Sequence, residues 1–440
     1  FSLTSLPPAL RPSLPPSLPP SAPFPGVSAV PRPEGWAHAE RAARESYGRL
    51  VAWLAYRWRD LAAAEDAMAD ALLAALEHWP VRGVPERPDA WLLTVARRQL
   101  LQRARHDRMA HAPDVLALLD EPDAAAAEAA EIPDDRLALF FVCAHPDIPA
   151  PVHAPLMLQT VLGLDAATIA SAFLVAPSAM AQRLVRAKSG IRERALRFEV
   201  PERREWGARL PAVLEGIYGA YSIGAQAAGA DVQVAAELPG EALALARILA
   251  HLAPDEPEVQ GLLALILYCE GRRPARFDAH GRFVALESQA VGAWDRGLID
   301  EAEQRLRAAA RAGRPGRFQW EAAIQSAHCQ RMYGGSTPWP VVASLYGRLV
   351  EVHGTVGAAI GHAVATAEAG APEVAIRMLD ALPPDAVKSH QPYWAARAHL
   401  ERRLGRDAAA RDAAMRAMGL TRDARVRAFL QSTFGVTGAA

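Results

Sequence analysis

Alanine, leucine, arginine and glutamate recur at helical spacing along most of the chain, whereas alternating apolar and polar runs bounded by turn residues are missing. Helices with one apolar face produce the first pattern, and half-buried strands produce the second. The sequence therefore predicts an all-α protein. Hydrophobic residues make up 51% of the 440 residues and charged residues 22%, a balance typical of globular proteins. Because a chain of this length exceeds one compact domain, we expect two or three folded units.

Composition divides the chain into five segments. Residues 1–33 are dense in proline, so we expect an extended, solvated leader and not the apolar helix of a signal peptide. A helical block covers residues 36–106; its first part ends at Trp79-Pro80, and Pro88-Asp89 opens a second helix with Asp89 as the N-cap. An acidic linker of low complexity is expected at 107–134, a compact block at 135–198 and a long helical region at 201–435.

The last region carries a weak internal repeat. Gly297, Gly370 and Gly405 each precede an alanine by five residues, and the last two glycines are 35 residues apart. The alanines are Ala302, Ala375 and Ala410. Each glycine is expected to end one helix and each alanine to let the next helix pack closely. The spacing is close to the ~34-residue period of tetratricopeptide helix pairs, so a helical solenoid is predicted, with an irregular α-helical bundle as the alternative.

Charge and cysteine content exclude several classes of protein. The 48 basic and 49 acidic side chains give a net charge of −1, which excludes a histone-like cation but leaves room for a local basic patch. Cys143, Cys269 and Cys329 are far apart, so no disulfide framework is expected and a reducing cytoplasm fits best. No apolar run approaches the about 18 to 20 residues that a membrane span needs.

No metal site, cofactor site or catalytic constellation is predicted. His145 and His153 lie near Cys143, but their spacing lacks the paired ligands of a zinc site, so buried or capping roles are expected for them. The motifs GxxxxGKS/T, GxSxG and HExxH do not occur. We therefore expect a protein that is not an enzyme and that takes no cofactor.

Residues 62–80, AAAEDAMADALLAALEHWP, form a predicted helix with an apolar stripe and an acidic stripe. The apolar stripe holds Met68, Leu72, Leu76 and Trp79. The acidic stripe holds Asp66, Asp70 and Glu77. This arrangement suits a helix that packs inward and offers carboxylates to a basic partner. A merely solvated acidic face is the alternative.

Residues 89–108, DAWLLTVARRQLLQRARHDR, form a second predicted helix with an apolar and a basic face. The apolar face holds Leu92, Val95, Ala96 and Leu100. The polar face holds Thr94, Arg98, Gln102 and Arg105, with Trp91 at its edge. Such a face can follow a phosphate backbone and stack on an unpaired base. A solvated basic helix is the alternative.

Residues 152–197 show the spacing of a helix-turn-helix. A helix ends at Gly163-Leu164, a short helix follows Asp165, and the turn 174–177 leads into a third helix capped by Ser178. The predicted buried positions are Ile169, Phe173, Met180, Leu184, Ala187 and Ile191. The predicted outward positions are Ser178, Ala179, Gln182 and Arg186, with Arg183 at the border. Gln and Arg can reach base edges in the major groove, and a plain helical hairpin is the alternative.

In this order the segments resemble RNA polymerase sigma factors of the extracytoplasmic-function group, in the subfamily with a C-terminal tetratricopeptide-like extension. Residues 62–80 are similar to sigma region 2.2, and residues 88–108 to regions 2.3 and 2.4. DDRLALFFVCAHPDI and FLVAPSAMAQRLVRAKSGIR resemble region 4, while RFEVPERREW and LLALILYCEGRRPARFDAHGRFVALESQAVGAWDRGLI resemble the extension. The resemblance covers roughly residues 36–435.

The resemblance implies a region 2 helical bundle, an acidic linker that threads toward the active-site cleft, a region 4 helix-turn-helix and a tetratricopeptide-like extension. Because the repeat follows region 4 directly, we expect the extension to regulate the factor, either by clamping the two sigma domains or by docking a protein partner on the solenoid surface. It implies binding to core RNA polymerase, through the β′ clamp helices and the β flap, and to promoter DNA. The implied clamp-helix contacts are Glu65, Asp66, Asp70 and Leu73. The implied −10 contacts, where a base is extruded, are Trp91, Arg97, Arg98, Gln102 and Arg105. The implied −35 contacts are Ser178, Ala179, Gln182, Arg183, Arg186 and Lys188.

The chain departs from the subfamily at three places. It reads RQLLQR at 98–103 where related sequences commonly read N-R-A-L-D-R, which is expected to alter but not abolish −10 recognition. Cys143-Ala144 replaces paired cysteines, and IYGAYSIGAQ replaces a Phe-Asn-Glu-Gly-Tyr phrase, which puts any contact carried over for that stretch in doubt. Two alternative functions stay open: a helix-turn-helix activator with a solenoid sensor and no sigma activity, and a scaffold or adaptor.

Overall fold

The structure is a computed structural model that describes residues 46–55, 57–58, 60–107, 136–173, 175–194, 201, 203–226, 232–421 and 423–436. Its regular elements in these ranges are helices, accompanied by one isolated antiparallel bridge between Phe277 and Phe283. The prediction of an all-α fold is therefore confirmed. The proline-rich leader and all but the first residue of the acidic linker lie outside the described residues.

The first block consists of a helical segment at 46–55 followed by α2 (Leu61–Arg82) and α3 (Pro88–Asp107). Asp60 caps α2 by accepting from the backbone N–H of Ala63 at 3.0 Å. The expected end at Trp79-Pro80 is wrong, because α2 continues through Pro80 for one half-turn. It stops at Gly83, whose φ of 85° leaves the helical region. A proline near a helix end disturbs few hydrogen bonds, so it does not terminate the helix here.

Asp89 is not the N-cap of α3, contrary to the expectation. It lies in the first turn, after Pro88, and its carboxylate accepts from the Ser46 hydroxyl and from the Arg49 guanidinium, both at 2.6 Å. This carboxylate therefore ties α3 to the preceding helical segment instead of closing its own first turn.

The second block contains α5 (Arg136–Cys143), the 3-10 turn η2 (Ala150–Val152), α6 (His153–Thr160), α7 (Ala166–Ala172) and α8 (Pro177–Glu193). Asp165 caps α7 as its position suggests, accepting from the backbone of Ala167 at 2.8 Å. Ser178 does not cap α8: the helix begins at Pro177 with Ala176 at the N-cap and no side-chain cap. Proline favours the first helical position, which shifts the start by two residues.

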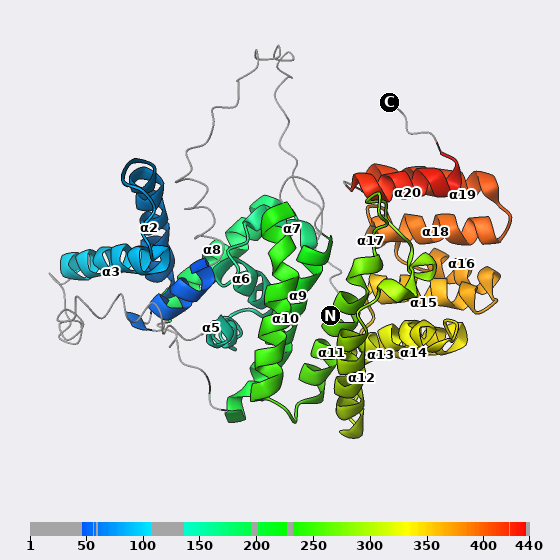
Figure 1. The fold of residues 1–440 in the computed structure, drawn as a ribbon, viewed down its shortest axis with the longest axis horizontal. Helices are drawn as coiled ribbons and strands as arrows, with labels where there is room; N and C mark the ends of the chain where they lie inside the picture. The colour runs from blue at the N-terminus through cyan, green and yellow to red at the C-terminus, as the bar shows by residue number, and fades with distance from the viewer. Residues whose placement is uncertain are drawn as a thin grey trace, which may run out of the picture.

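The long third region begins with α9 (Trp206–Gln226), preceded by η3 (Arg203–Glu205), and α10 (Val232–Leu252). Then follow α11 (Pro257–Arg272), α12 (Arg296–Arg311), α13 (Arg317–Cys329), α14 (Trp339–Val352), α15 (Val356–Glu368), α16 (Pro372–Asp380), α17 (Pro384–Val387), α18 (Gln391–Arg403), α19 (Asp407–Leu420) and α20 (Ala424–Phe434). Short 3-10 turns are η4 (Arg273–Ala275), η5 (Leu286–Ser288), η6 (Val291–Ala293) and η7 (Gln330–Tyr333). Successive helices pack on one another, and the chain runs from α2 and α3 at one side of the molecule to α20 at the other (Figure 1).

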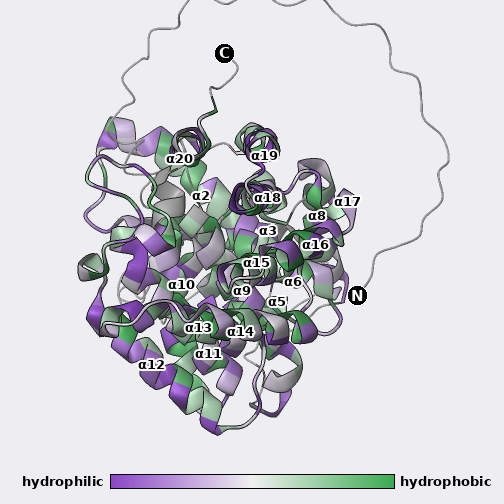
Figure 2. Cartoon of the chain, turned by 90° about the vertical axis from the view of Figure 1, so that its right-hand side faces the viewer, coloured by the Kyte–Doolittle hydropathy of each residue, from purple (hydrophilic) through white to green (hydrophobic). Residues whose placement is uncertain are grey.

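The predicted repeat is right at two of its three positions. Gly370 and Gly405 follow α15 and α18 with φ of 103° and 71°, and the alanines five residues later are buried. Gly297 is different: it lies in the first turn of α12, which Asp295 caps, so it ends no helix. α12 carries mostly hydrophilic residues (Figure 2), as expected of a helix on the outside of a helical array. A tetratricopeptide-like arrangement stays a prediction.

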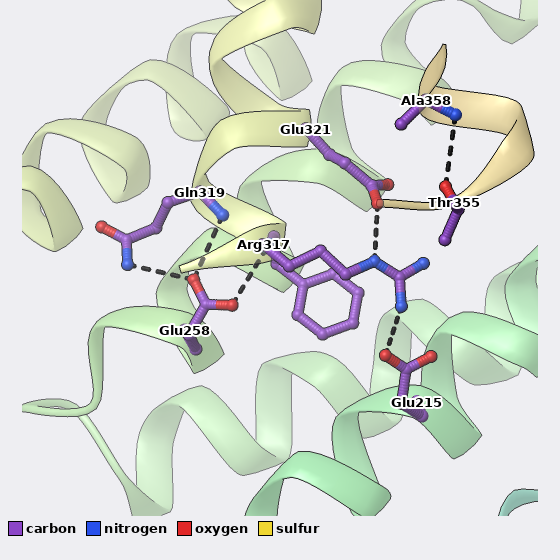
Figure 3. A network of polar contacts seen from close by, with 8 residues as sticks. Glu215, Glu258, Arg317, Gln319, Glu321, Thr355 and Ala358 are labelled. Atoms are coloured by element: carbon purple, nitrogen blue, oxygen red, sulfur yellow. Dashed lines mark hydrogen bonds and ion pairs between the residues drawn. The ribbon is translucent and has the colours of Figure 1, made fainter. Parts of the chain in front are cut away.

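A polar network fixes α13 against α9 and α11. The guanidinium of Arg317 donates to Glu321 at 2.7 Å and to Glu215 of α9 (Figure 3). Glu258 of α11 accepts from the backbone N–H groups of Phe318 and Gln319, which are free donors in the first turn of α13. The largest apolar core extends from Leu50 to Cys329 and so joins the first two blocks to the beginning of the third region.

Candidate nucleic-acid and protein interface

The acidic stripe of α2 lies at the surface, as predicted, and part of it is neutralised from within the chain. Arg103 of α3 donates to Asp66 at 3.2 Å and to Asp70 at 3.0 Å. Exposed ion pairs of this kind contribute only about 0–1 kcal/mol, so a basic partner can replace the arginine at little cost. Leu73 is 60% exposed one turn further along the helix, and it adds an apolar contact to the same surface.

Glu65, the third acidic residue of α2 expected to contact the polymerase, differs from Asp66 and Asp70 because it is nearly buried. Its carboxylate meets the Lys188 ammonium of α8 at 2.8 Å, and the two side chains are 11% and 22% exposed. A residue expected to contact a polymerase and a residue expected to contact DNA are therefore joined to each other. In this arrangement neither is available to an outside partner.

A cavity of about 600 Å³ adjoins this ion pair. Its walls come from the first block, from α6 to α8 and from α10, and include Asp66, Arg136 and Glu241. Arg136 at the start of α5 lies 3.8 Å from Glu241 of α10. The three segments of the chain thus meet around a polar space lined by both signs of charge.

Of the residues on α3 that are predicted to contact the −10 element, some are exposed and others are enclosed. Arg98 and Gln102 are exposed. Arg97 is only 9% exposed, and the ring of Trp91 packs edge-on against Trp79 with 5.5 Å between centroids. The side chain of Arg105 lies outside the described residues. Arg98 and Gln102 are therefore the residues of this set that can meet a nucleic acid without rearrangement.

The pair α7 and α8 presents a polar face, as the sequence predicts. The angle between the two helices is 111°, within the about 90–120° range of helix-turn-helix pairs. Met180, Leu184, Ala187 and Ile191 are buried, which confirms the predicted stripe. Ser178, Gln182, Arg183 and Arg186 are exposed, and Ala179 is half-buried. Phe173 was expected to be buried, but it is 38% exposed because it follows the last turn of α7.

The block at 136–194 is completed by α9, which the sequence did not indicate. A Cβ atom built on Gly216 of α9 would overlap the sulfur of Met157. The Trp206 ring lies 4.7 Å from that of Phe141, and Arg209 donates to the Phe141 carbonyl at 3.1 Å. The close approach of α9 makes it part of the same core as α5 and α6.

His145 and His153 have the structural roles expected of them. His153 Nε2 lies 2.7 Å from the Ile148 carbonyl oxygen, and His145 Nδ1 accepts from the backbone N–H of Asp147. Burial lowers the pKa of both imidazoles and raises the pKa of the Cys143 thiol. In the described ranges no group of three or more His, Cys, Asp or Glu side chains is placed to hold a metal ion.

Helix length and hydropathy give one further finding. Across the described residues no single helix is long and apolar enough to cross a membrane. Within those residues, α7 and α8 together have the length and apolar composition of a span, but the pair is bent by 111°.

Comparison with known proteins identifies two parts of the chain. Residues 44–109 match the family described as Sigma-70 region 2, and residues 209–310 match the family of unknown function DUF6596. The chain is 36% identical over 380 residues to an uncharacterized protein of Rhizobium meliloti (strain 1021), an overlap of 85% of this chain and 90% of that protein. No solved structure matches the chain. The first match spans α2 and α3, and the second spans α9 to α12 almost completely.

Proposed function

We propose that the chain is a sigma-70 family member that binds core RNA polymerase, directs it to promoters through their −35 and −10 elements, and initiates transcription. A sigma-70 region 2 supports binding to core polymerase and to promoter DNA, and hence a sigma-factor-like role in transcription initiation. The observation that carries the proposal is the match over 44–109, because it falls on the two helices with the acidic stripe and the polar face. We place the chain in the extracytoplasmic-function group with a C-terminal extension.

Polymerase binding is assigned to Asp66, Asp70 and Leu73 on α2, facing the β′ clamp helices. Glu65 joins them only when its ion pair with Lys188 opens, and the same opening frees Lys188 for DNA. Arg103 holds the two aspartates in the free protein, and cations of the clamp would take its place. The exposure of Leu73 fits the same contact, since an apolar residue among charges is typical of the centre of a protein interface.

The first prediction concerns these aspartates. The double variant Asp66→Asn, Asp70→Asn is expected to bind core polymerase at least tenfold more weakly, because hydrogen bonds to charged groups contribute about 1.5–3 kcal/mol each. Fluorescence anisotropy with labelled protein measures the affinity. Asp385→Asn, an exposed carboxylate on α17 outside the acidic stripe, is the matched control. Equal affinities of the double variant and the wild type would contradict the assignment.

Promoter contacts are assigned to α3 for the −10 element and to α8 for the −35 element. Arg98 and Gln102 are the exposed members of the first set, with Trp91, Arg97 and Arg105 added after rearrangement. On α8 the residues are Ser178, Ala179, Gln182, Arg183, Arg186 and Lys188. The buried stripe of α8 supports the assignment, because it leaves the opposite face free to enter a major groove.

The second prediction separates base contacts from phosphate contacts on α8. Arg186→Ala is expected to weaken binding of the polymerase complex to its own −35 sequence by about 5- to 150-fold and to relax discrimination there, since a specific base contact contributes about 1–3 kcal/mol. Arg192→Ala, nearer the C-terminal end of the helix, is expected to weaken all sequences equally. Electrophoretic mobility shifts on matched and mutated −35 elements distinguish the two effects. Identical behaviour of both variants would remove Arg186 from the readout.

The C-terminal region is proposed to regulate the factor by holding region 2 and region 4 together. Region 4 is joined to α9 and α10, and region 2 is joined to region 4 through Glu65 and Lys188. Deletion of the residues beyond about 200 is therefore expected to change promoter output. A helix-turn-helix activator with a solenoid sensor is the alternative function. It is less well supported because an activator needs no region 2.

Run-off transcription tests the proposal. Core polymerase and the upstream region of this gene are incubated with and without the protein. A protein-dependent transcript is expected, and mapping its start gives the −35 and −10 elements. Silence together with no binding to core polymerase would contradict the proposal and favour the activator. Silence with intact binding would indicate that the C-terminal region holds the factor inactive.

A further inference from the structure

The segment between α11 and α12, residues 276–291 and here called the strap, reaches from one side of the helical array to its last helix (Figure 1). The backbone N–H of Asp295 donates to the Gly271 carbonyl at 2.7 Å, so the segment leaves and returns at the same place. A tight turn at its tip pairs Phe277 with Phe283. The Phe283 ring lies 5.3 Å from that of Phe429 on α20, and the Arg425 guanidinium lies 4.2 Å from the Phe277 ring centre.

Most of the strap lies outside the core, although Leu286 and Val291 are partly buried against it and Gln289 is only 9% exposed. No residue from Arg276 to Ser288, a stretch that the structure describes in full, is buried. Side chains of the array grip its backbone instead: Arg331 donates to the carbonyls of Leu286 at 2.7 Å and Gln289 at 3.0 Å. Backbone carbonyls are common to every sequence, so another extended chain can satisfy this arginine equally well.

One strap side chain is recognised specifically. The Glu287 carboxylate accepts from the Thr337 hydroxyl at 3.1 Å and lies 3.7 Å from His328 Nδ1. Arg331 donates to the carbonyls of the neighbouring residues Leu286 and Gln289, and its guanidinium carbon lies 5.4 Å from the centre of the Trp294 ring. The surface therefore offers a hydroxyl and an imidazole to one carboxylate, and a cation to the backbone carbonyls on either side of it.

The strap does not satisfy the polar groups of this surface completely. Among the described residues beside the strap, His328 Nδ1 and Trp294 Nε1 are buried atoms without a hydrogen-bond partner, and His328 is only 7% exposed. Buried polar groups without partners are costly, typically about 1–3 kcal/mol each. A ligand that supplied those partners would bind better than the strap does.

We propose that the surface formed by His328, Arg331, Thr337, Arg425 and Phe429 is a docking site for an extended peptide of a partner protein, with a carboxylate at the position of Glu287 and an aromatic side chain against α20. The strap occupies this site in the free protein and is displaced by the partner. Charge supports this choice of partner, because the site presents the Arg331 guanidinium to an acidic segment, whereas Arg425 is already paired with Asp423 at 3.1 Å. The inference goes beyond promoter recognition and does not depend on it.

A tethered strap competes strongly with a free peptide. Its effective concentration is on the order of millimolar, so only the small fraction of molecules with a released strap can bind. Weakening the strap must therefore raise the apparent affinity for a peptide in trans. If the strap could not be released from the helical array, weakening it would not raise the apparent affinity for a peptide.

The test uses the full chain and a fluorescent peptide copying residues 276–291. The variant Phe277→Ala, Phe283→Ala is expected to bind this peptide at least tenfold more tightly than the wild type does. Adding Arg331→Met to that variant is expected to lose at least tenfold, and a peptide with Glu287→Gln is expected to bind severalfold more weakly. Arg348→Met, an exposed arginine paired with Glu351 away from the strap, is the control.

Hydrogen exchange of the Asp278 and Val284 amides, both bonded within the strap, reports whether the variant has released it. Fast exchange without peptide binding would overturn the docking site. Unchanged slow exchange would overturn the proposal as well, because the strap would then not be displaceable. Both readouts are independent of transcription, so failure here leaves the sigma-factor proposal intact, and a silent run-off assay leaves this proposal intact.

Discussion

A chain ending after residue 200 is expected to lose the fold of its second block, residues 136–194, and not to become a factor freed from inhibition. Phe140, Phe141, Met157 and Leu158 are at most 1% exposed, and each has a neighbour on α9. Burying such a side chain contributes about 1.5–3 kcal/mol. Exposing even half of this surface would cost about 3–6 kcal/mol, a large part of the about 5–15 kcal/mol that stabilises a whole domain.

Hydrogen exchange of α6 measures this loss directly, and run-off transcription measures its consequence. The control is a chain ending at residue 353, which keeps the largest apolar core complete because its last member is Cys329. We expect α6 to be protected in the longer chain and unprotected in the shorter one. Protection of α6 at the wild-type level in the chain of 200 residues would contradict the expectation, and transcription by that chain would show that transcription initiation does not require α9.

The helices themselves were predictable, because they follow from local periodicity. The buried stripe of α8, Met180 to Ile191 at every third or fourth residue, needs nothing beyond the pattern of apolar side chains. Helix ends were less predictable, since caps compete with other partners. Asp89 has the residue type and position of a cap, but Ser46 and Arg49 claim its carboxylate. Gly297 resembles a helix stop, but Asp295 two residues earlier starts a helix there.

The contacts that define the candidate interface were not predictable from one sequence. Lys188 and Glu65 are 123 residues apart, and Arg103 and Asp70 are 33 apart, so no local pattern links them. The roles of Gly48 and Gly216 depend on which backbone or side chain approaches them in the fold. The contact of Gly48 with the end of α6 and the contact of α9 with Met157 at Gly216 both require a residue without a side chain, and composition alone does not reveal this. Gly48 and Gly216 are the positions where one substitution is expected to have the largest effect.

Gly48→Ala is expected to separate the first block, residues 46–107, from the second block, residues 136–194. A Cβ atom at this position would overlap the Val161 carbonyl oxygen at the end of α6, and backbone cannot move aside as a flexible side chain can. The two blocks must then part or shift. Either movement breaks the ion pair between Glu65 and Lys188, which lies in the same interface. Of the residues predicted to contact the −35 element, Lys188 is the one that this interface covers, so promoter binding without polymerase is expected to rise only through the release of that cation.

The composition of the chain offers a sharp measurement of this opening, because Lys188 and Lys388 are its only lysines. Lys188 is 22% exposed, whereas Lys388 is 70% exposed and serves as the internal reference. The rate of amine acetylation at Lys188 relative to Lys388 is expected to be low in the wild type and to approach one in Gly48→Ala. Glu65→Gln is expected to give an intermediate ratio, since it frees the ammonium without forcing the backbones apart.

Gly207→Ala is the matched control, because a Cβ atom there meets nothing within 4 Å. It is expected to leave the acetylation ratio unchanged. An unchanged ratio in Gly48→Ala would mean that the first block is not held against the second block through Gly48. A raised ratio without tighter promoter binding would mean that the blocks separate but that α8 was already accessible to DNA. In that case the ion pair would orient region 2 for polymerase instead of masking the recognition helix.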